Sequence, residues 1–312
     1  MPATPLSHWI GFHFFILILF VGELAFARRR ASQSSNDETH RTAIVATTVW
    51  ITAALAVALF ILRSLGHTAA IQYIAGYTIE ESLSIDNLFV FLLLFRFFHI
   101  EPARQPKVLL WGVFGAIPMR AAFIAAGLSL LARFHWISYI FALILLAAAI
   151  RLFMPHTDTP SEQPPVWLRW LAKVHPVSLR QDRFLVPAAE SPTRRPLITV
   201  LFLCLIAIEL TDLVFALDSI PAVLSITSHP FLAYTSNIMA IMGLRSLYYL
   251  LAHLLDRLRF LHYGLASILL FAAIKMLAAP WFQLGPILSL LTILSILAVT
   301  IALSLLKAQP QV

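Results

Sequence analysis

Nine apolar segments of membrane-spanning length follow one another along the chain, separated by shorter polar stretches. An α-helix crosses the hydrocarbon core of a bilayer with about 20 mainly apolar residues, and it satisfies its backbone hydrogen bonds within the segment. The pattern therefore predicts an all-α polytopic membrane protein with about nine transmembrane helices. They are expected over residues 9–27, 43–62, 69–95, 107–131, 135–153, 197–223, 230–252, 260–279 and 285–306.

The composition agrees with this fold class. Hydrophobic residues make up 60% of the chain and charged residues 12%, whereas soluble domains carry about 25% charged residues. The net charge of +7 does not indicate a nucleic-acid partner, because the basic residues lie in loops between the apolar segments, where they favour membrane topology and contact with the lipid bilayer. The single cysteine, Cys204, excludes an internal disulfide framework and a thiolate metal cluster.

The positions of arginine and lysine predict the orientation. If the N-terminus lies outside, most basic loop residues lie on the cytoplasmic side, whereas Arg63 and Arg133 lie on the other side. The positive-inside rule thus predicts a multi-pass protein of the cell (inner or plasma) membrane, with the N-terminus outside and the C-terminus cytoplasmic. The long loop 154–196 is then cytoplasmic, and its many prolines favour a connector over a domain.

A polar motif occurs twice inside the apolar segments. An acid, five residues, a second acid and an amide or hydroxyl residue are found at Glu80…Asp86-Asn87 and at Asp212…Asp218-Ser219, and the matching arginines that follow are Arg120 and Arg245. Each repeat would hold three spans, so the two halves would cross the membrane in opposite senses, as do the inverted repeats of secondary transporters. The chain then divides into two N-terminal spans, repeat 1, the Pro-rich loop, repeat 2 and a C-terminal span with its tail: residues 1–68, 69–153, 154–196, 197–279 and 280–312.

More acids than bases lie within the spans. A charged side chain at this depth costs about 2.5–3.5 kcal/mol on insertion scales. The bases are Arg120, Arg245 and Lys275, of which Lys275 could extend outward to the interface. Glu23 is close enough in sequence to the arginines at 28–30 to pair with them at a span end. The acids deep within the spans are Glu80, Glu81, Asp86, Glu209, Asp212 and Asp218.

Two explanations for these acids are open. In the first, arginines neutralise them, one pair per repeat, in a buried network that only fixes helix packing. In the second, the surplus of negative charge is balanced by protons or by a bound cation. Carboxylate, amide and hydroxyl oxygens suit Mg²⁺, Ca²⁺ and Mn²⁺ rather than zinc or copper. The metal ligands expected on this hypothesis are Glu80, Asp86, Asn87, Asp212, Asp218 and Ser219.

The auxiliary charges have separate expected roles. Arg120 and Arg245 would neutralise the carboxylates when the cation is absent, and Glu81 and Glu209 would carry protons. The chain has no phosphate-binding glycine loop and no nucleophile motif, so neither an enzymatic activity nor an organic cofactor is expected.

Helix geometry restricts how the acids could meet. Six residues along one helix separate two side chains by roughly 9 Å and 120°, so a single straight helix cannot direct both acids at one ion. If the two motif helices pack antiparallel, Glu80 is level with Asp218, Asp86 is level with Asp212, and positions 83 and 215 lie close together. Each layer could then hold a cation. Pro221 leaves the Leu217 carbonyl without its helical partner, which predicts a broken helix beside Asp218.

At these residues the chain resembles the TerC family of integral membrane proteins, including its Alx branch. The resemblance covers roughly residues 70–280, and four segments carry it: Glu80–Phe91, Glu209–Ala222, Thr235–Tyr249 and Leu254–Arg257. It implies a plasma-membrane protein of metal homeostasis. Several family members are linked to manganese efflux and others to tellurium resistance.

The resemblance and the oxygen ligands together predict a transporter that exports Mn²⁺ through a carboxylate-lined site at the interface of the two repeats. Ca²⁺ and Mg²⁺ are the alternative ions. The alternative function is a non-transporting membrane assembly factor, a scaffold that assists metalation or insertion of other proteins. A homo-oligomer and complexes with other membrane proteins are left open.

Overall fold

The computed structural model describes residues 4–31, 36–126, 139–140, 142–147, 149–150, 153, 177–187, 197–255, 260–279, 281–282 and 284–306. Within these ranges some side chains are not described, among them those of Asp86 and Asp218. The predicted span over 135–153 is described only in pieces, residues 139–140, 142–147, 149–150 and 153, which are all helical, and the total of nine spans stays a prediction.

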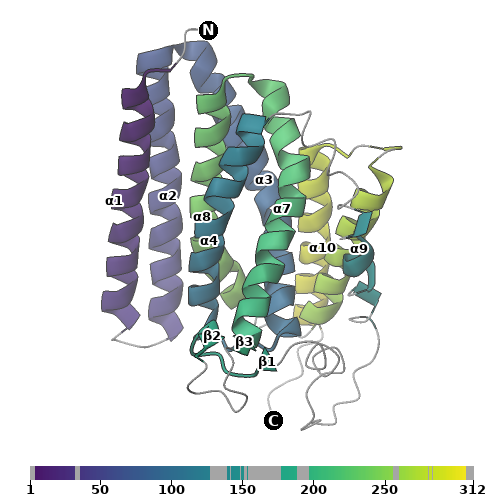
Figure 1. Cartoon of the computed structure of the whole chain (residues 1–312). Helices are drawn as coiled ribbons and strands as arrows, with labels where there is room; N and C mark the ends of the chain where they lie inside the picture. The colour runs from purple at the N-terminus through teal and green to yellow at the C-terminus, as the bar shows by residue number, and fades with distance from the viewer. Residues whose placement is uncertain are drawn as a thin grey trace.

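Long helices dominate the described part of the chain and run up and down one bundle (Figure 1). The apolar segments form them because a helix is the structure that leaves no backbone group unsatisfied in lipid. Five are long and apolar enough to cross a membrane: those over Leu6–Phe26, Arg41–Leu65, Gln105–Ala126, Val200–Ile226 and Ile287–Ser304. The helices are α1 (Leu6–Ala31), α2 (Asn36–Leu65), α3 (His67–Phe97), α4 (Gln105–Ala126), α7 (Val200–Ile226), α8 (Pro230–Leu255), α9 (Leu261–Ala278) and α10 (Pro286–Leu306).

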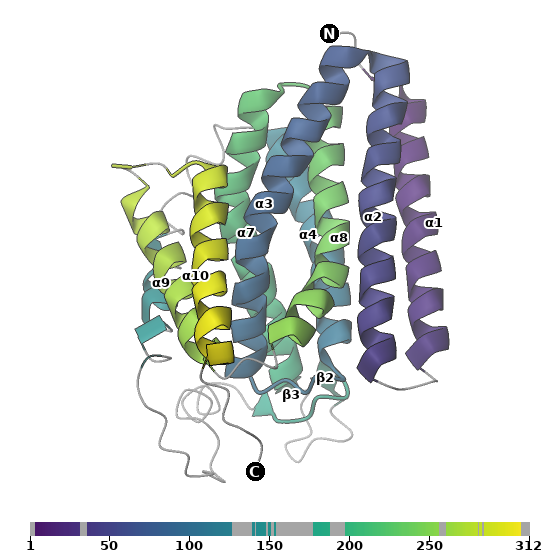
Figure 2. The same cartoon turned by 180° about the vertical axis from the view of Figure 1, so that it is seen from behind.

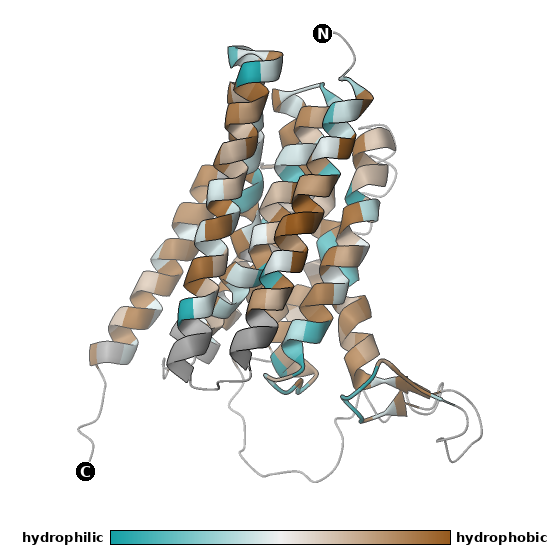
Figure 3. Ribbon diagram, turned by 90° about the vertical axis from the view of Figure 1, so that its left-hand side faces the viewer, coloured by the Kyte–Doolittle hydropathy of each residue, from teal (hydrophilic) through white to brown (hydrophobic). Residues whose placement is uncertain are grey.

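Helices α3, α4, α7 and α8 form the centre of the bundle, with α1 and α2 on one side and α9 and α10 on the other (Figures 1 and 2). Hydrophobic residues, coloured brown, occur along most of the length of the helices (Figure 3). Apolar residues such as Phe14 of α1 and Leu291 of α10 are exposed in the isolated chain, as expected for surfaces that contact lipid.

The direction of the helices matters for the predicted repeats. We call the end of the bundle at which α1 begins the upper end and the opposite end the lower end (Figure 1). Helix α3 runs from the upper to the lower end and α7 runs back up, while α4 runs up and α8 runs down (Figure 1). These opposite directions are what inverted repeats require. The internal symmetry of the two halves stays a prediction.

A glycine and a side-chain hydrogen bond connect helices at the upper end. Gly66 joins α2 to α3 with a positive φ of 92°, a backbone conformation that glycine adopts without the steric cost of a Cβ. Just after the end of α7, the Thr227 hydroxyl donates to Gln72 Oε1 of α3 at 3.0 Å. This hydrogen bond links the upper parts of α3 and α7.

A small sheet that the sequence did not predict lies at the lower end of this mostly helical structure. Strands β1 (Val177–Ser178), β3 (Leu197–Thr199) and β2 (Leu185–Val186) lie in the order β1-β3-β2, with β1 parallel and β2 antiparallel to β3 (Figure 1). Ile198 is the residue of β3 opposite both Val177 and Leu185. Strands this short leave no alternating pattern in the sequence from which they could be predicted.

The sheet is attached to the lower ends of the central helices. The Gln181 side chain donates to the His99 carbonyl and accepts from the Glu101 backbone N–H, both at 2.9 Å, in the turn between α3 and α4. Lys107 of α4 donates to the Asp182 carbonyl at 2.8 Å. Thr199 of β3 is also the N-cap of α7, where its hydroxyl accepts from the Phe202 backbone N–H at 3.2 Å. Residues 177–187 of the long loop are therefore fixed to α3 and α4, and through β3 to α7.

Candidate cation site

One buried guanidinium joins the four central helices. Arg120 of α4 donates to Asp212 of α7 through Nη2 to Oδ1 at 2.7 Å and Nε to Oδ2 at 3.1 Å. Its Nη1 donates to Glu80 of α3 and, at 3.0 Å, to Asn237 Oδ1 of α8. Arg120 and Asn237 are 0% exposed. The two acids that stand first in the two motifs therefore share a single counter-charge.

This arrangement differs from one acid–arginine pair per repeat. Arg120 belongs to the first predicted repeat, and it binds Glu80 from the same repeat and Asp212 from the second. One positive charge faces two carboxylates, which are 1% and 6% exposed. Buried ions tolerate low dielectric only when they are paired and hydrogen-bonded. The three side chains therefore carry a net negative charge, unless a proton or a cation balances it.

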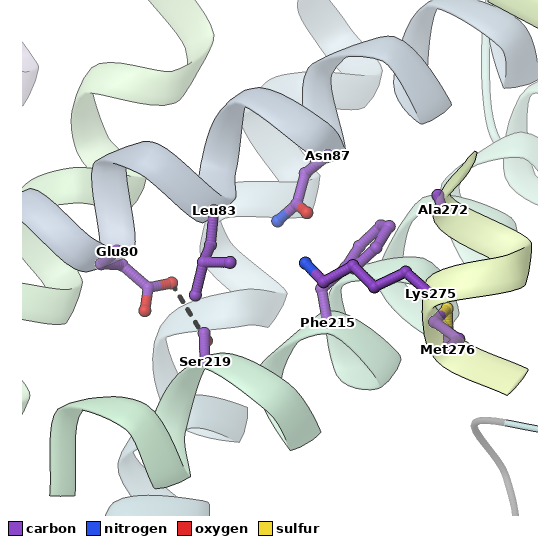
Figure 4. Close-up of a pocket in the computed structure, with 8 residues that line it drawn as sticks. All are labelled: Glu80, Leu83, Asn87, Phe215, Ser219, Ala272, Lys275 and Met276. Carbon is purple, nitrogen blue, oxygen red and sulfur yellow. Dashed lines mark hydrogen bonds between the residues drawn. The ribbon is translucent and has the colours of Figure 1, made fainter. Parts of the chain in front are cut away.

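A cavity lies beside Glu80, between α3, α7 and α9. It has a volume of about 20 Å³, room for about one water molecule or a dehydrated cation of similar size. The Ser219 hydroxyl donates to Glu80 Oε1 at 3.3 Å across the cavity (Figure 4). The residues that line it are Glu80, Leu83, Asn87, Phe215, Ser219, Ala272, Lys275 and Met276.

The antiparallel packing predicted from the motif agrees with these contacts. Glu80 lies beside Ser219, the residue after Asp218, and Leu83 and Phe215 line the same cavity. The predicted break in the second motif helix is wrong, because α7 continues through Pro221 to Ile226. A proline inside a helix removes one backbone donor but does not have to end the helix when the neighbouring turns remain packed.

Two oxygens at the cavity lack partners. Within the described residues, Glu80 Oε2 and Asn87 Oδ1 are buried and accept no hydrogen bond. Their side chains are 1% and 2% exposed. A buried acceptor without a donor costs about 1–3 kcal/mol, more when it is charged. A cation beside either oxygen would supply the missing partner, which makes this cavity the candidate cation site.

The full ligand set predicted from the sequence is only partly brought together. Glu80, Asn87 and Ser219 line the cavity, while Asp212 lies across Arg120 from Glu80. The side chains of Asp86 and Asp218 lie outside the described residues, although their backbones belong to α3 and α7. Among the side chains that the structure describes, no three His, Cys, Asp or Glu residues are grouped closely enough to hold a metal ion.

The second arginine, Arg245 of α8, has a different partner from the one expected. Its Nη2 lies 2.6 Å from Glu23 Oε1 of α1, and Trp50 of α2 donates from Nε1 to Glu23 Oε2 at 3.0 Å. The guanidinium also lies 5.3 Å from the centre of the Phe20 ring. Glu23 therefore has a partner that was not expected, and the side chains of the arginines at 28–30 lie outside the described residues. No local signal in the sequence indicates a contact between α1 and α8.

The two predicted proton carriers lie near the cluster. Glu209 lines a second cavity together with Asp212 and Arg245. Its carboxylate packs against Gly115 of α4 so closely that a Cβ at this glycine would overlap it. Glu81 is partly buried, and its Oε2 has no hydrogen-bond partner in the described part of the chain. The role of the two acids as proton carriers stays a prediction.

Lys275 was not expected to belong to the site. Instead of extending outward, its side chain reaches from α9 toward Asn87 and Phe215 (Figure 4). Its ammonium donates to Ser289 Oγ of α10 at 3.0 Å. The lysine therefore belongs to the lining of the candidate cation site.

Comparison with known proteins identifies the family. The profile described as "Integral membrane protein TerC family" matches residues 65–311. A "Putative membrane-bound redox modulator Alx" of Escherichia coli K12 is 36% identical over 309 residues, covering 96% of this chain and 94% of that protein. An "Uncharacterized membrane protein STKORF319" of Myxococcus xanthus is 34% identical over 301 residues, which are 96% of this chain and 92% of the relative. No solved structure matches the chain. With most of its length matched by the profile and by these relatives, the chain belongs to the TerC family of integral membrane proteins.

Proposed function

We propose that this TerC-family protein exports divalent cations across the cell membrane, with Mn²⁺ as its substrate. The observation that carries the proposal is the convergence of Glu80 and Asp212, from the two motif helices, on one buried guanidinium. Ionisable residues inside a membrane bundle typically mark a substrate or ion pathway. The unpartnered oxygens of Glu80 and Asn87 beside them add neutral and charged ligands of the kind that hard divalent cations prefer.

Arg120 is a protein-borne cation that occupies the place between the two carboxylates. In the proposed cycle, a divalent cation binds Glu80 and Asp212, and Arg120 gives up its bonds to them while Asn237 continues to accept from it. Asn87 and Ser219 contribute oxygens, and Asp86 and Asp218 complete the ligand set. Competition between the arginine and the cation keeps the site from holding its substrate irreversibly.

The name of the Alx relatives describes a redox role. Thiol–disulfide exchange requires two thiols, whereas this chain has the single cysteine Cys204, which is 0% exposed. We therefore assign no disulfide step to this chain. Manganese export does not require one, because the ion crosses the membrane without a change of oxidation state.

The test uses purified full-length protein in liposomes. Native protein should move Mn²⁺, and Glu80→Gln or Asp212→Asn should reduce the initial rate by about 100-fold or more while the protein remains folded, since each removes a charged ligand. The matched control is Asp182→Asn in the lower sheet, where the carboxylate pairs with Arg183 at the surface. This variant should transport at the native rate. Folded native protein that moves neither Mn²⁺, Ca²⁺ nor Mg²⁺ would contradict the proposal and favour the assembly-factor function.

A further inference from the structure

Lys275 is the one lysine or arginine of α9, and it faces inward. A lysine near the end of an apolar helix commonly extends its ammonium to the membrane interface. Here the residue lines the cavity that also holds Glu80, Asn87 and Ser219 (Figure 4). Burying a charge costs free energy, so favourable interactions must stabilise the ammonium in this inward position.

Helix α10 holds the ammonium in this position. Ser289, which accepts from Lys275 Nζ at 3.0 Å, is itself 1% exposed and lies in the first turn of α10. Further along, Gly264 of α9 lies so close to Thr300 of α10 that a Cβ would meet the threonine hydroxyl at 2.6 Å. The tight packing of α9 against α10 therefore fixes where the ammonium lies relative to α3 and α7.

Lys275 adds a positive charge beside the described acids of the cluster. Glu80 and Asp212 carry two negative charges, and Arg120 between them supplies one positive charge. Lys275, across the cavity from Glu80, supplies a second one. A divalent cation carries the same charge as these two side chains together. If it entered the cavity, it would come close to the ammonium and be repelled by it.

We propose that the Lys275 ammonium is a built-in competitor of the divalent cation, which lowers the affinity of the site and speeds release of the bound ion. This inference rests on the proposed function and adds a residue that sets affinity and release. The guanidinium of Arg120 neutralises the carboxylates from the α4 side. The ammonium of Lys275 acts from the α9 side, in the cavity where Glu80 Oε2 and Asn87 Oδ1 lack partners.

The experiment compares Mn²⁺ binding and Mn²⁺ transport. Lys275→Met, which keeps the length of the side chain and removes the charge, should lower the Kd of purified full-length protein for Mn²⁺ by about tenfold, since a like charge is removed from the site. The Kd is measured from the free-Mn²⁺ electron paramagnetic resonance signal. In liposomes the same variant should transport more slowly than native protein at saturating Mn²⁺, because tighter binding slows release.

Two further variants control for charge. Lys275→Arg keeps the positive charge and should stay within about threefold of the native Kd. Lys107→Met removes an ammonium from the lower end, where it donates to the Asp182 carbonyl, and should leave the Kd unchanged. A purely structural role for Lys275 would give weaker Mn²⁺ binding in the methionine variant, the opposite of the expected change.

The outcomes separate this inference from the proposed function. Native transport with an unchanged or raised Kd in folded Lys275→Met overturns the role of the lysine and leaves cation export in place. Native protein that binds no Mn²⁺ overturns both. If the methionine variant does not fold, Lys275→Gln retains a donor for Ser289 and should show the same lowered Kd. Misfolding of both variants would identify Lys275 as a structural residue and overturn the inference.

Discussion

Asp212 accepts hydrogen bonds from Arg120 through both of its carboxylate oxygens, at 2.7 and 3.1 Å. Such a bidentate pair restricts both the distance and the orientation of the two side chains. It fixes α7 against α4 at the level where Glu80 of α3 meets the same guanidinium. The position of each central helix at this level therefore depends on one arginine.

Replacement of Arg120 should show this dependence. Arg120→Leu leaves Glu80 and Asp212 buried without a counter-charge, and loss of one partner from a buried ion pair costs about 3–5 kcal/mol. We expect a lowered unfolding temperature in detergent that Mn²⁺ partly restores, because the ion replaces the missing charge. Arg104→Leu, at an exposed pair with Glu101, should change the unfolding temperature little. Equal effects of the two substitutions would contradict the central role of Arg120.

Gly115 tests the packing of the Glu209 carboxylate. A Cβ at this position would overlap Glu209, so Gly115→Ala should displace the carboxylate and reduce both the unfolding temperature and the transport rate. Glu209→Ala in the same chain should restore the unfolding temperature but not the transport. Gly243→Ala is the control, because its Cβ would meet Trp50 at an ordinary 3.8 Å. If Gly115→Ala transports Mn²⁺ at the native rate, transport does not require the Glu209 carboxylate to lie in this position.

Cross-linking tests the packing of the two motif helices. In a Cys204→Ala background, cysteines at Leu83 and Phe215 should form a disulfide or react with a short bifunctional reagent, since both residues line one cavity. The pair of Leu83 and Leu210 should not react, because Leu210 is 52% exposed on another face of α7. Absence of the first cross-link under oxidising conditions in membranes would contradict the contact between α3 and α7.

The ion pair between Glu23 and Arg245 should stabilise the docking of α1. Glu23→Ala and Arg245→Ala should each lower the free energy of unfolding by about 3–5 kcal/mol, because each leaves a buried charge unpaired. The double variant should be less destabilised than the sum of the two. Additive effects would instead indicate that Arg245 acts on other acids, such as Glu209 in the neighbouring cavity. Chemical unfolding of the three variants supplies the measurement.

The sequence predicted the helices and placed the acids within them, but it did not predict all of the acids' partners. The apolar runs and the buried charges are local signals, and each is found within a helix. The pair of Glu23 with Arg245 and the inward direction of Lys275 depend on which helices become neighbours, for which a single sequence holds no local signal. The opposite directions of α3 and α7 could be predicted because equivalent spans of the two halves are offset by three, an odd number.

The small sheet has a mechanical consequence for the central helices. At the lower end, Gln181 binds the turn that follows α3, and Thr199 leads directly from β3 into α7. At the upper end, a hydrogen bond from Thr227 to Gln72 connects the end of α7 to α3. A rocking motion of α7 against α3 would therefore pivot at the sheet and give its largest displacement at the opposite end. The strands would then act as a hinge.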